Sequence, residues 1–168
     1  MFYRVFIGLG SNLGNRRANY QKALELVAAL PKTRVVKRSS LYESEPIGDA
    51  KNWYVNGAIE IETEFAPDKL LHRLQATEQA MGRKKTPQTK KWASRKIDLD
   101  ILLFDNYIIE TRSLKIPHPE LQNRRFVLLP LSELAPQLIH PRLGVTIAEL
   151  LAALKDEKRV LLLPPHAA

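Results

Sequence analysis

The chain of 168 residues contains no cysteine. Disulfide bonds, thiolate nucleophiles and cysteine-ligated metal centres are therefore excluded. Long apolar runs are also missing, because no stretch approaches the roughly 20 residues that a membrane-spanning helix requires. The opening segment Met1–Ile7 has the pattern of a strand and not of a signal peptide. We therefore expect a cytoplasmic protein that does not bind membranes.

Familiar nucleotide-binding motifs are missing too. Gly8, Gly10 and Gly14 form a glycine cluster, but Leu13 stands where the dinucleotide-binding fingerprint needs its third glycine. No P-loop motif occurs, and no histidine lies at zinc-ligand spacing from another ligand. The cluster instead predicts a tight turn whose backbone approaches either a ligand or the next helix closely.

The elements that are present predict one domain over residues 1–168. Strands are expected at 2–9, 34–42, 54–65 and 97–104, and helices at 15–30, 67–81, 126–134 and 146–154, with a loop at 43–52 and a short hairpin at 107–116. In the third strand glutamates alternate with apolar residues, so one face of that strand should meet water. Pro130 is compatible with the third helix only if the helix begins close to it. The element order predicts an α/β (α+β) ferredoxin-like sandwich, with a mainly antiparallel sheet flanked by helices.

Two aspartates in the strand at 97–104 are the strongest functional signal. Asp98 and Asp100 should project from one face, roughly 6.6 Å apart along the strand, while Ile101 and Leu103 point into the core on the other face. Paired carboxylates in a largely buried strand repel each other and are costly to desolvate. A pair of Mg²⁺ ions would remove both penalties, whereas the alternative is a solvated pair matched by lysine or arginine.

A local excess of positive charge precedes this strand. The net charge is +8, and seven basic residues lie between Arg83 and Lys96 without any acidic residue. Thr86–Thr89 interrupts the cluster and indicates a loop. A basic loop beside paired carboxylates suits phosphoryl transfer from a nucleotide, in which metal ions and basic side chains neutralise the phosphates. We predict that the loop from Arg83 to Trp92 is mobile and closes over bound ATP.

These motifs resemble those of a known enzyme family. The run Lys91–Leu102, with Arg95 three residues before Asp98, resembles the signature of the 6-hydroxymethyl-7,8-dihydropterin pyrophosphokinases of folate synthesis. Four further motifs resemble the family in the same order along nearly the whole chain: Gly8–Gly14, Ser39–Tyr42 leading to Pro46–Gly48, Tyr54–Asn56, and Ile116–His118 through Asn123–Phe126.

The resemblance implies transfer of pyrophosphate from ATP to the hydroxymethyl group of the pterin, with release of AMP. It implies two Mg²⁺ ions on Asp98 and Asp100, two small-molecule substrates, no nucleic-acid partner, and a monomer. The implied catalytic residues are Arg83, Arg95, Asp98 and Asp100. The implied ATP-binding residues are Gln75, Glu78, Arg83, Trp92, Arg95, Ile101, Lys115, His118 and Arg124. The implied pterin-binding residues are Gly10, Ser44, Glu45, Ile47, Tyr54, Asn56, Trp92, Asp98 and Phe126.

Two departures from the family pattern and two other functions remain open at this point. Glu45 lies where some members have proline, and Pro119 follows His118 where some members have tyrosine. An RNA-binding module of ferredoxin-like fold is one alternative, although the aromatic strand motif of that class is missing. A Mg²⁺-dependent nucleotidyltransferase or nuclease that uses the same two aspartates is the other.

Overall fold

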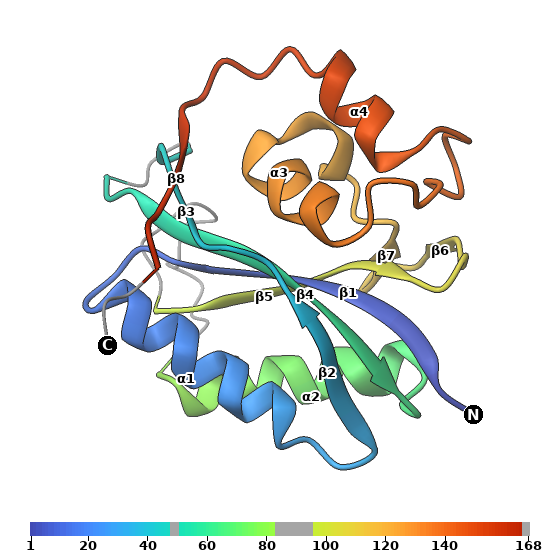
Figure 1. Cartoon of the computed structure of the whole chain (residues 1–168). Coiled ribbons are helices and arrows are strands. Elements are labelled where there is room, and N and C mark those ends of the chain that lie inside the picture. Colours follow the sequence, from blue (N-terminus) through green and yellow to red (C-terminus); the bar gives the residue numbers. More distant parts are fainter. Residues whose placement is uncertain (48–50, 83–95, 166–168) are drawn as a thin grey trace.

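An antiparallel sheet forms the middle layer of the structure, a computed structural model that describes residues 1–47, 51–82 and 96–165 (Figure 1). Strand β1 (Tyr3–Ser11) lies between β5 (Asp98–Phe104) and β4 (Tyr54–Thr63). Strand β4 also pairs with β2 (Thr33–Arg38) and β3 (Tyr42–Ser44), and β3 pairs with β8 (Val160–Leu162). All of these pairs are antiparallel. The predicted mainly antiparallel sheet with flanking helices is confirmed.

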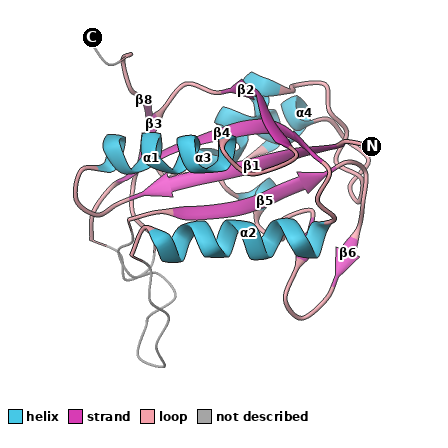
Figure 2. Ribbon diagram, turned by 90° about the horizontal axis from the view of Figure 1, so that it is seen from below, coloured by secondary structure: helices cyan, strands magenta, loops and turns pink. Residues whose placement is uncertain are grey.

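Helices α1 (Arg16–Ala28) and α2 (Pro67–Ala80) cover one face of the sheet, which Figure 2 shows from their side. The Asn15 side chain caps α1 by accepting a hydrogen bond from the backbone N–H of Ala18, and proline occupies the start of α2, where no backbone donor is needed. The apolar stripes of both helices pack on alternate strand residues. This core includes Val5, Ile7, Leu24, Val27, Ile59, Ile61, Leu70, Leu74, Leu99 and Ile101.

Helices α3 (Arg125–Leu134) and α4 (Ile147–Ala153) pack on the opposite face. Their core includes Phe6, Ala58, Leu102, Leu103, Leu121, Leu128 and Leu131. The 3₁₀ helix η1 (Leu121–Asn123) leads into α3, and the antiparallel strands β6 (Ile109–Glu110) and β7 (Lys115–Ile116) form the predicted hairpin. The Thr146 side chain caps α4, because its hydroxyl accepts a hydrogen bond from the Glu149 backbone N–H at 3.1 Å. In the described ranges, no helix has the length and apolar character needed to cross a membrane.

The single strand expected at 34–42 is wrong, because the chain forms β2 and β3 with a break between them. Pairing of β2 with β4 is already irregular between Val35 and Lys37. At the break, the Ser39 hydroxyl accepts a hydrogen bond from the backbone N–H of Ala58 at 2.9 Å. Glu43 and Ser44 then belong to a strand rather than to the predicted loop.

Two predictions about side-chain faces also fail. A register shift opposite Phe6 and Ile7 places an extra residue in β5, so Leu103 joins Leu102 in the α3 core rather than Ile101 in the other core. In β4, Glu60 does not face water: only 6% of it is exposed, and Arg4 donates to its carboxylate at 3.2 and 3.3 Å. The second helical layer covers this part of the strand.

Two features near the C-terminus differ from expectation. Pro130 lies well inside α3, which begins at Arg125. Its missing N–H removes one helical hydrogen bond, but its ring is buried in the packed layer. Strand β8 was not predicted, and the segment that leads to it arches from α4 across to β3 (Figure 1).

Candidate active site

A row of small and polar residues crosses the sheet on the α3 side, beyond the apolar contacts of that helix. Gly10 pairs with Asp98 on one side and with Asn56 on the other, and Asn56 pairs with Tyr42. Directly paired residues share a face, so these side chains project together. The next row holds Asp100 opposite Gly8. The two predicted aspartates therefore lie on the same face of the sheet as Gly8 and Gly10.

The aspartates differ in burial. Asp98 is half-buried and Asp100 is exposed, so the predicted cost of desolvating both carboxylates does not apply to Asp100. Within the described ranges, no group of three or more histidine, aspartate or glutamate residues is placed to enclose a metal. An open pair of carboxylates is the kind of site that Mg²⁺ prefers to a closed protein cage. Mg²⁺ commonly takes one or two carboxylates and completes its shell with water and substrate phosphates.

Glu78 on α2 fixes the outer edge of β5 between the aspartates. Its buried carboxylate accepts a hydrogen bond from the backbone N–H of Leu99 at 2.8 Å. Backbone groups two residues apart point in the same direction, so the N–H of Ile101 also faces away from β1. The side chain of Ile101 is buried in the α1–α2 core. The predicted role of Ile101 in ATP binding therefore requires its backbone.

Several predicted pterin-binding residues on β1, β3 and β4 lie close together around Gly10. A Cβ atom at Gly10 would lie 3.3 Å from Cδ1 of Tyr54 and 3.4 Å from Nδ2 of Asn56. Ser44, which pairs with Tyr54 across β3 and β4, donates its hydroxyl to Oδ1 of Asn56 at 2.8 Å. This bond leaves the amide NH₂ of Asn56 on the Gly10 side. The structure brings Gly10, Ser44, Tyr54 and Asn56 together, and their role in pterin binding stays a prediction.

Tyr42 and Glu133 join β3 to α3 beside this row. The Tyr42 hydroxyl donates to the Glu133 carboxylate at 2.7 Å, and the Ser40 backbone N–H and hydroxyl donate to it at 2.9 and 2.8 Å. Burial and the hydrogen bond to Glu133 raise the pKa of Tyr42 to about 12. Burial alone would raise the pKa of Glu133, but the three hydrogen bonds together hold it below its ordinary value.

His118 lies next to Leu102 of β5, two residues beyond Asp100. Its backbone N–H donates to the Leu102 carbonyl at 3.0 Å, and its Nδ1 accepts the Glu120 backbone N–H at 3.1 Å. Burial, followed by the nearby charge of Arg124, lowers the pKa of His118 to about 4. The imidazole is therefore neutral at pH 7 with its proton on Nε2. It can donate one hydrogen bond to a phosphate or hydroxyl oxygen without carrying charge.

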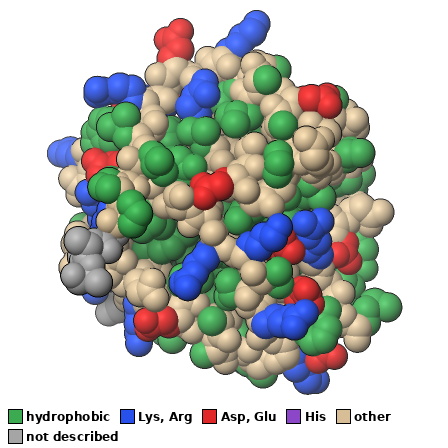
Figure 3. Space-filling view, in the orientation of Figure 1, with side chains coloured by type: hydrophobic (Ala, Val, Ile, Leu, Met, Phe, Trp, Pro, Cys, Tyr) green, Lys and Arg blue, Asp and Glu red, His purple; other side chains and the backbone are tan. Residues whose placement is uncertain are grey.

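The other predicted site residues that the structure describes lie on α2, on β7, after β3 and around the start of α3. Arg124 precedes α3, and its guanidinium lies 5.8 Å from the ring centre of half-buried Phe126. Gln75 is half-buried on α2 and Lys115 is exposed on β7. Glu45 and Ile47 are half-buried after β3. Arg83, Trp92 and Arg95, with the predicted loop from Arg83 to Trp92, lie outside the described residues. On the face shown in Figure 3, basic side chains lie among acidic ones over the described parts.

One part of this neighbourhood, the C-terminal strand, was not predicted from the sequence. The C-terminal strand β8 lies directly beside β3, and Arg159 ahead of it contacts Glu45 and Trp53. The only signal in the sequence is the short apolar run Val160–Leu163 after a basic residue. Three or four apolar residues near a chain end predict neither a strand nor its partner.

Comparison with known proteins agrees with this arrangement. The family model described as 7,8-dihydro-6-hydroxymethylpterin-pyrophosphokinase (HPPK) matches residues 6–136. The chain is 45% identical over 154 residues to the 2-amino-4-hydroxy-6-hydroxymethyldihydropteridine pyrophosphokinase of Pseudomonas aeruginosa, covering 91% of this chain and 93% of that protein. It is 41% identical over 161 residues to the protein of the same name from Haemophilus influenzae, covering 95% and 98%.

Solved structures share the fold at much lower identity. Wild-type Plasmodium falciparum HPPK-DHPS with pteroate matches with a TM-score of 0.69 and 14% identity over 90% of this chain, and an HPPK-DHPS in complex with substrates matches with 0.69 and 15%. The chain spans less than half of those longer proteins, 44% and 43% respectively. The fold match and the two close relatives agree with the family model. The chain belongs to the 7,8-dihydro-6-hydroxymethylpterin-pyrophosphokinase family.

Proposed function

We propose that this protein is an ATP-dependent diphosphokinase of folate biosynthesis. It transfers pyrophosphate from ATP to the hydroxymethyl group of 6-hydroxymethyl-7,8-dihydropterin and releases AMP and the pterin diphosphate. Family membership and the names of the two relatives support the activity. One observation connects this activity with particular residues: Asp98, Gly10 and Asn56 lie side by side on one face of the sheet.

The pterin is proposed to bind over the part of this row that holds Gly10 and Asn56. A flat ring fits against the Tyr54 ring, which leans over Gly10, and Phe126 supplies the second aromatic surface from α3. The Asn56 amide, held by Ser44, offers hydrogen bonds to the polar edge of the ring. Glu45 and Ile47 complete this side, and Asp98 stands next to the hydroxymethyl group that is to react.

ATP is proposed to lie along the outer side of β5. Gln75, Glu78 and the backbone of Ile101 face the adenosine part, while Lys115, His118 and Arg124 bind the phosphates from the other side of the strand. His118 contributes a neutral N–H donor and Arg124 a fixed positive charge, which a planar guanidinium can share between two phosphate oxygens. Arg83, Trp92 and Arg95 are proposed to close the site from the basic loop.

Asp98 and Asp100 would hold two Mg²⁺ ions, with phosphate oxygens and water as the other ligands. When bound, Mg²⁺ neutralises charge on the triphosphate and polarises the attacked phosphorus. The carboxylates keep the reacting ends of both substrates on the open face, and the apolar residues on either side of them keep β5 rigid. All residues of this proposal come from one chain over residues 1–168, so a single domain acting as a monomer suffices. We place the enzyme in the cytoplasm, where ATP is available.

The direct test is incubation with ATP, Mg²⁺ and 6-hydroxymethyl-7,8-dihydropterin. The expected products are AMP and pterin diphosphate in equal amounts, with no AMP when the pterin is left out. Formation of ADP, or AMP formation that ignores the pterin, would contradict the proposal. Strand cleavage or nucleotide incorporation would favour a nuclease or nucleotidyltransferase, and salt-sensitive RNA binding without turnover would favour an RNA-binding module.

A further inference from the structure

The C-terminal segment is built into the sheet next to the proposed pterin residues. Strand β8 pairs with all three residues of β3, and its first residue, Val160, lies opposite Ser44. The backbone N–H of Leu163 then donates to the Leu41 carbonyl at 2.9 Å. Figure 1 shows that the chain reaches this position by crossing over from α4. The pairing therefore brings the residue before β8 level with the residue after β3.

Those two residues, Arg159 and Glu45, hold each other by both backbone and side chain. The Glu45 backbone N–H donates to the Arg159 carbonyl at 3.1 Å, and the Arg159 backbone N–H donates to the Glu45 carboxylate at 2.6 Å. The Arg159 Nε lies 3.4 Å from the same carboxylate oxygen. The bond from the Arg159 backbone N–H is the largest cause that keeps the pKa of Glu45 below its ordinary value. Glu45 is therefore ionised at neutral pH and aimed at Arg159.

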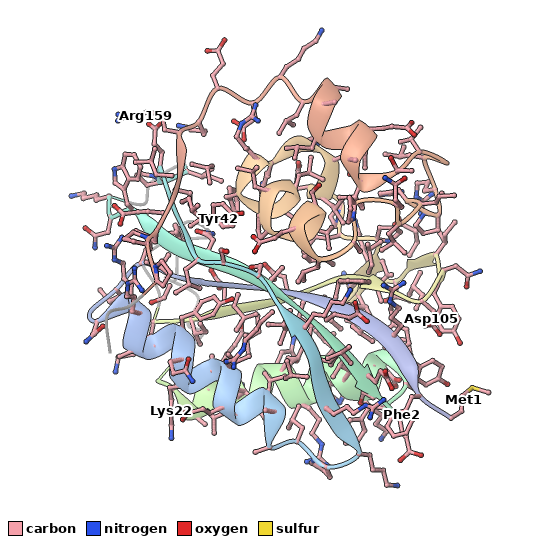
Figure 4. All side chains as sticks on the ribbon, in the orientation of Figure 1. Met1, Phe2, Lys22, Tyr42, Asp105 and Arg159 are labelled. Atoms are coloured by element: carbon pink, nitrogen blue, oxygen red, sulfur yellow. The ribbon has the colours of Figure 1, made fainter. Side chains whose placement is uncertain are left out.

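Arg159 also reaches a second piece of the chain. Its guanidinium lies 5.1 Å from the ring centre of Trp53, the residue before Tyr54. The Trp53 carbonyl is itself held by Arg16, which donates to it at 3.0 Å and to the Glu43 carboxylate at 3.1 Å. Figure 4 shows Arg159 at this end of the sheet, far from Met1 and Phe2. One side chain thus touches the segments that lead out of β3 and into β4.

We propose that Arg159 is a positioning residue for the pterin substrate, acting through Glu45 and Trp53. The inference rests on the proposed function, because Ser44 and Tyr54 are the pterin residues at the ends of the two segments that Arg159 joins. Without Arg159 these ends keep their strand pairing, but Glu45 and Trp53 lose the group that holds them together. Ordering them would then oppose pterin binding, since immobilising side chains and loops on binding costs free energy. ATP binds along β5, on the far side of β1, and does not depend on this contact.

The test compares three variants in steady-state kinetics and in direct binding of each substrate. Arg159→Ala removes the guanidinium and keeps the backbone bonds. Arg159→Lys keeps a positive charge that reaches Glu45 and the Trp53 ring. Arg34→Ala is the matched control, because Arg34 forms an ion pair with Glu62 at 2.9 Å and its guanidinium lies 6.0 Å from the ring centre of Phe2, far from Arg159.

The KM and Kd for the pterin should rise about fivefold in Arg159→Ala, as expected for the loss of an exposed ion pair together with one cation–π contact. The values for ATP should stay within about twofold of wild type, and the melting temperature should match that of Arg34→Ala. Arg159→Lys should recover most of the pterin affinity. Glu45→Gln should weaken pterin binding as well, and adding it to Arg159→Ala should cost less than the two single effects combined, because the residues act as a pair.

Equal loss of ATP and pterin affinity, or an unchanged pterin affinity in Arg159→Ala, would overturn the positioning role. The wild-type protein in the same assay separates this failure from a failure of the proposed function. Wild-type turnover that needs the pterin, together with an unaffected Arg159→Ala, removes only the role of Arg159. A wild type that neither binds nor consumes the pterin removes both.

Discussion

The two faces of one strand, β1, have different tasks. On the face toward α1 and α2, Val5, Ile7 and Leu9 are all large, apolar and buried. On the opposite face the side chains shrink along the strand, from Phe6 under α3 to Gly8 and Gly10 beside the aspartates. Side-chain size thus marks where packing ends and the site begins. One face carries large apolar side chains along its whole length, while the other carries glycines at the end where the aspartates lie.

The largest effect should come from removing a carboxylate on the open face. Asp98→Ala should lower turnover at least about a thousandfold, because charge neutralisation at the phosphates contributes several kcal/mol to transition-state stabilisation. The melting temperature should change little, since the side chain is only half-buried. Glu25→Ala is the control, because Glu25 is an exposed carboxylate on α1, which packs on the opposite face of the sheet. Turnover within tenfold of wild type in folded Asp98→Ala would remove the metal-binding role.

A glycine on the sheet face that α1 and α2 cover should matter for stability instead. A Cβ at Gly57 would lie 2.2 Å from the Tyr20 hydroxyl oxygen and 2.9 Å from Cζ of that ring. Gly57→Ala should therefore lower the free energy of unfolding by about 3 kcal/mol, as overpacking of a tight core does. Urea unfolding measures the loss. Adding Tyr20→Phe, which deletes the nearest atom, should restore part of it, and a cost below about 0.5 kcal/mol for Gly57→Ala would contradict the packing.

Protonation of His118, beside the proposed ATP site, should change the free energy of unfolding by an intermediate amount. Because the folded pKa of His118, about 4, lies below the ordinary 6.5, the folded state favours the neutral imidazole. The resulting stability is present above pH 6.5 and is lost as the pH falls through 6.5 toward 4, by about 3 kcal/mol at most, because one pKa unit corresponds to about 1.4 kcal/mol. His118→Gln should flatten this part of the stability curve. An NMR titration that finds a His118 pKa near 6.5 would contradict the burial that lowers it.

The smallest change in stability should come from a glycine on the open face. Gly10→Ala places a Cβ 3.3 Å from the Tyr54 ring, which is partly exposed and can shift slightly. We expect a loss below about 1 kcal/mol in unfolding but a pterin KM about fivefold higher, since the displaced ring loses its contact with the substrate. Isothermal titration with pterin and with ATP measures the difference. A variant that is as destabilised as Gly57→Ala and binds pterin normally would erase the distinction between the faces.

The sequence predicts the covered face and the aspartates well because both depend on local alternation. Strand periodicity alone places Asp98 and Asp100 together, and helical spacing finds the stripes of α1 and α2. The bulge near Leu102 could not be predicted, because it arises from the pairing of β5 with β1. The burial of Glu60 depends on its pairing with β1, where Arg4 binds its carboxylate, and β1 lies far away along the chain. Strand β8 depends on β3 in the same way, and so the contacts of Arg159 were missed.

The candidate site divides along the same line. Gly10, Ser44, Tyr54 and Asn56 come together on two paired strands, which the strand pattern and the family motifs could anticipate. The tasks of Glu78 and His118 in fixing β5 and the segment beside it depend on single hydrogen bonds between distant segments. No pattern of residue types shows such bonds. The roles of Arg83, Trp92 and Arg95 stay predictions, because those residues lie outside the described ranges.

The central claim is that neighbouring residues of β5 divide chemistry from stability by face. Asp100 and its neighbour Ile101 test it most directly, with turnover and urea unfolding measured on Asp100→Asn and Ile101→Ala. We expect Asp100→Asn to lose at least about a hundredfold in turnover and to keep its stability. Ile101→Ala should lose about 2 to 5 kcal/mol of stability, while its folded fraction stays active. Near-normal turnover in Asp100→Asn, or unchanged stability in Ile101→Ala, would contradict it.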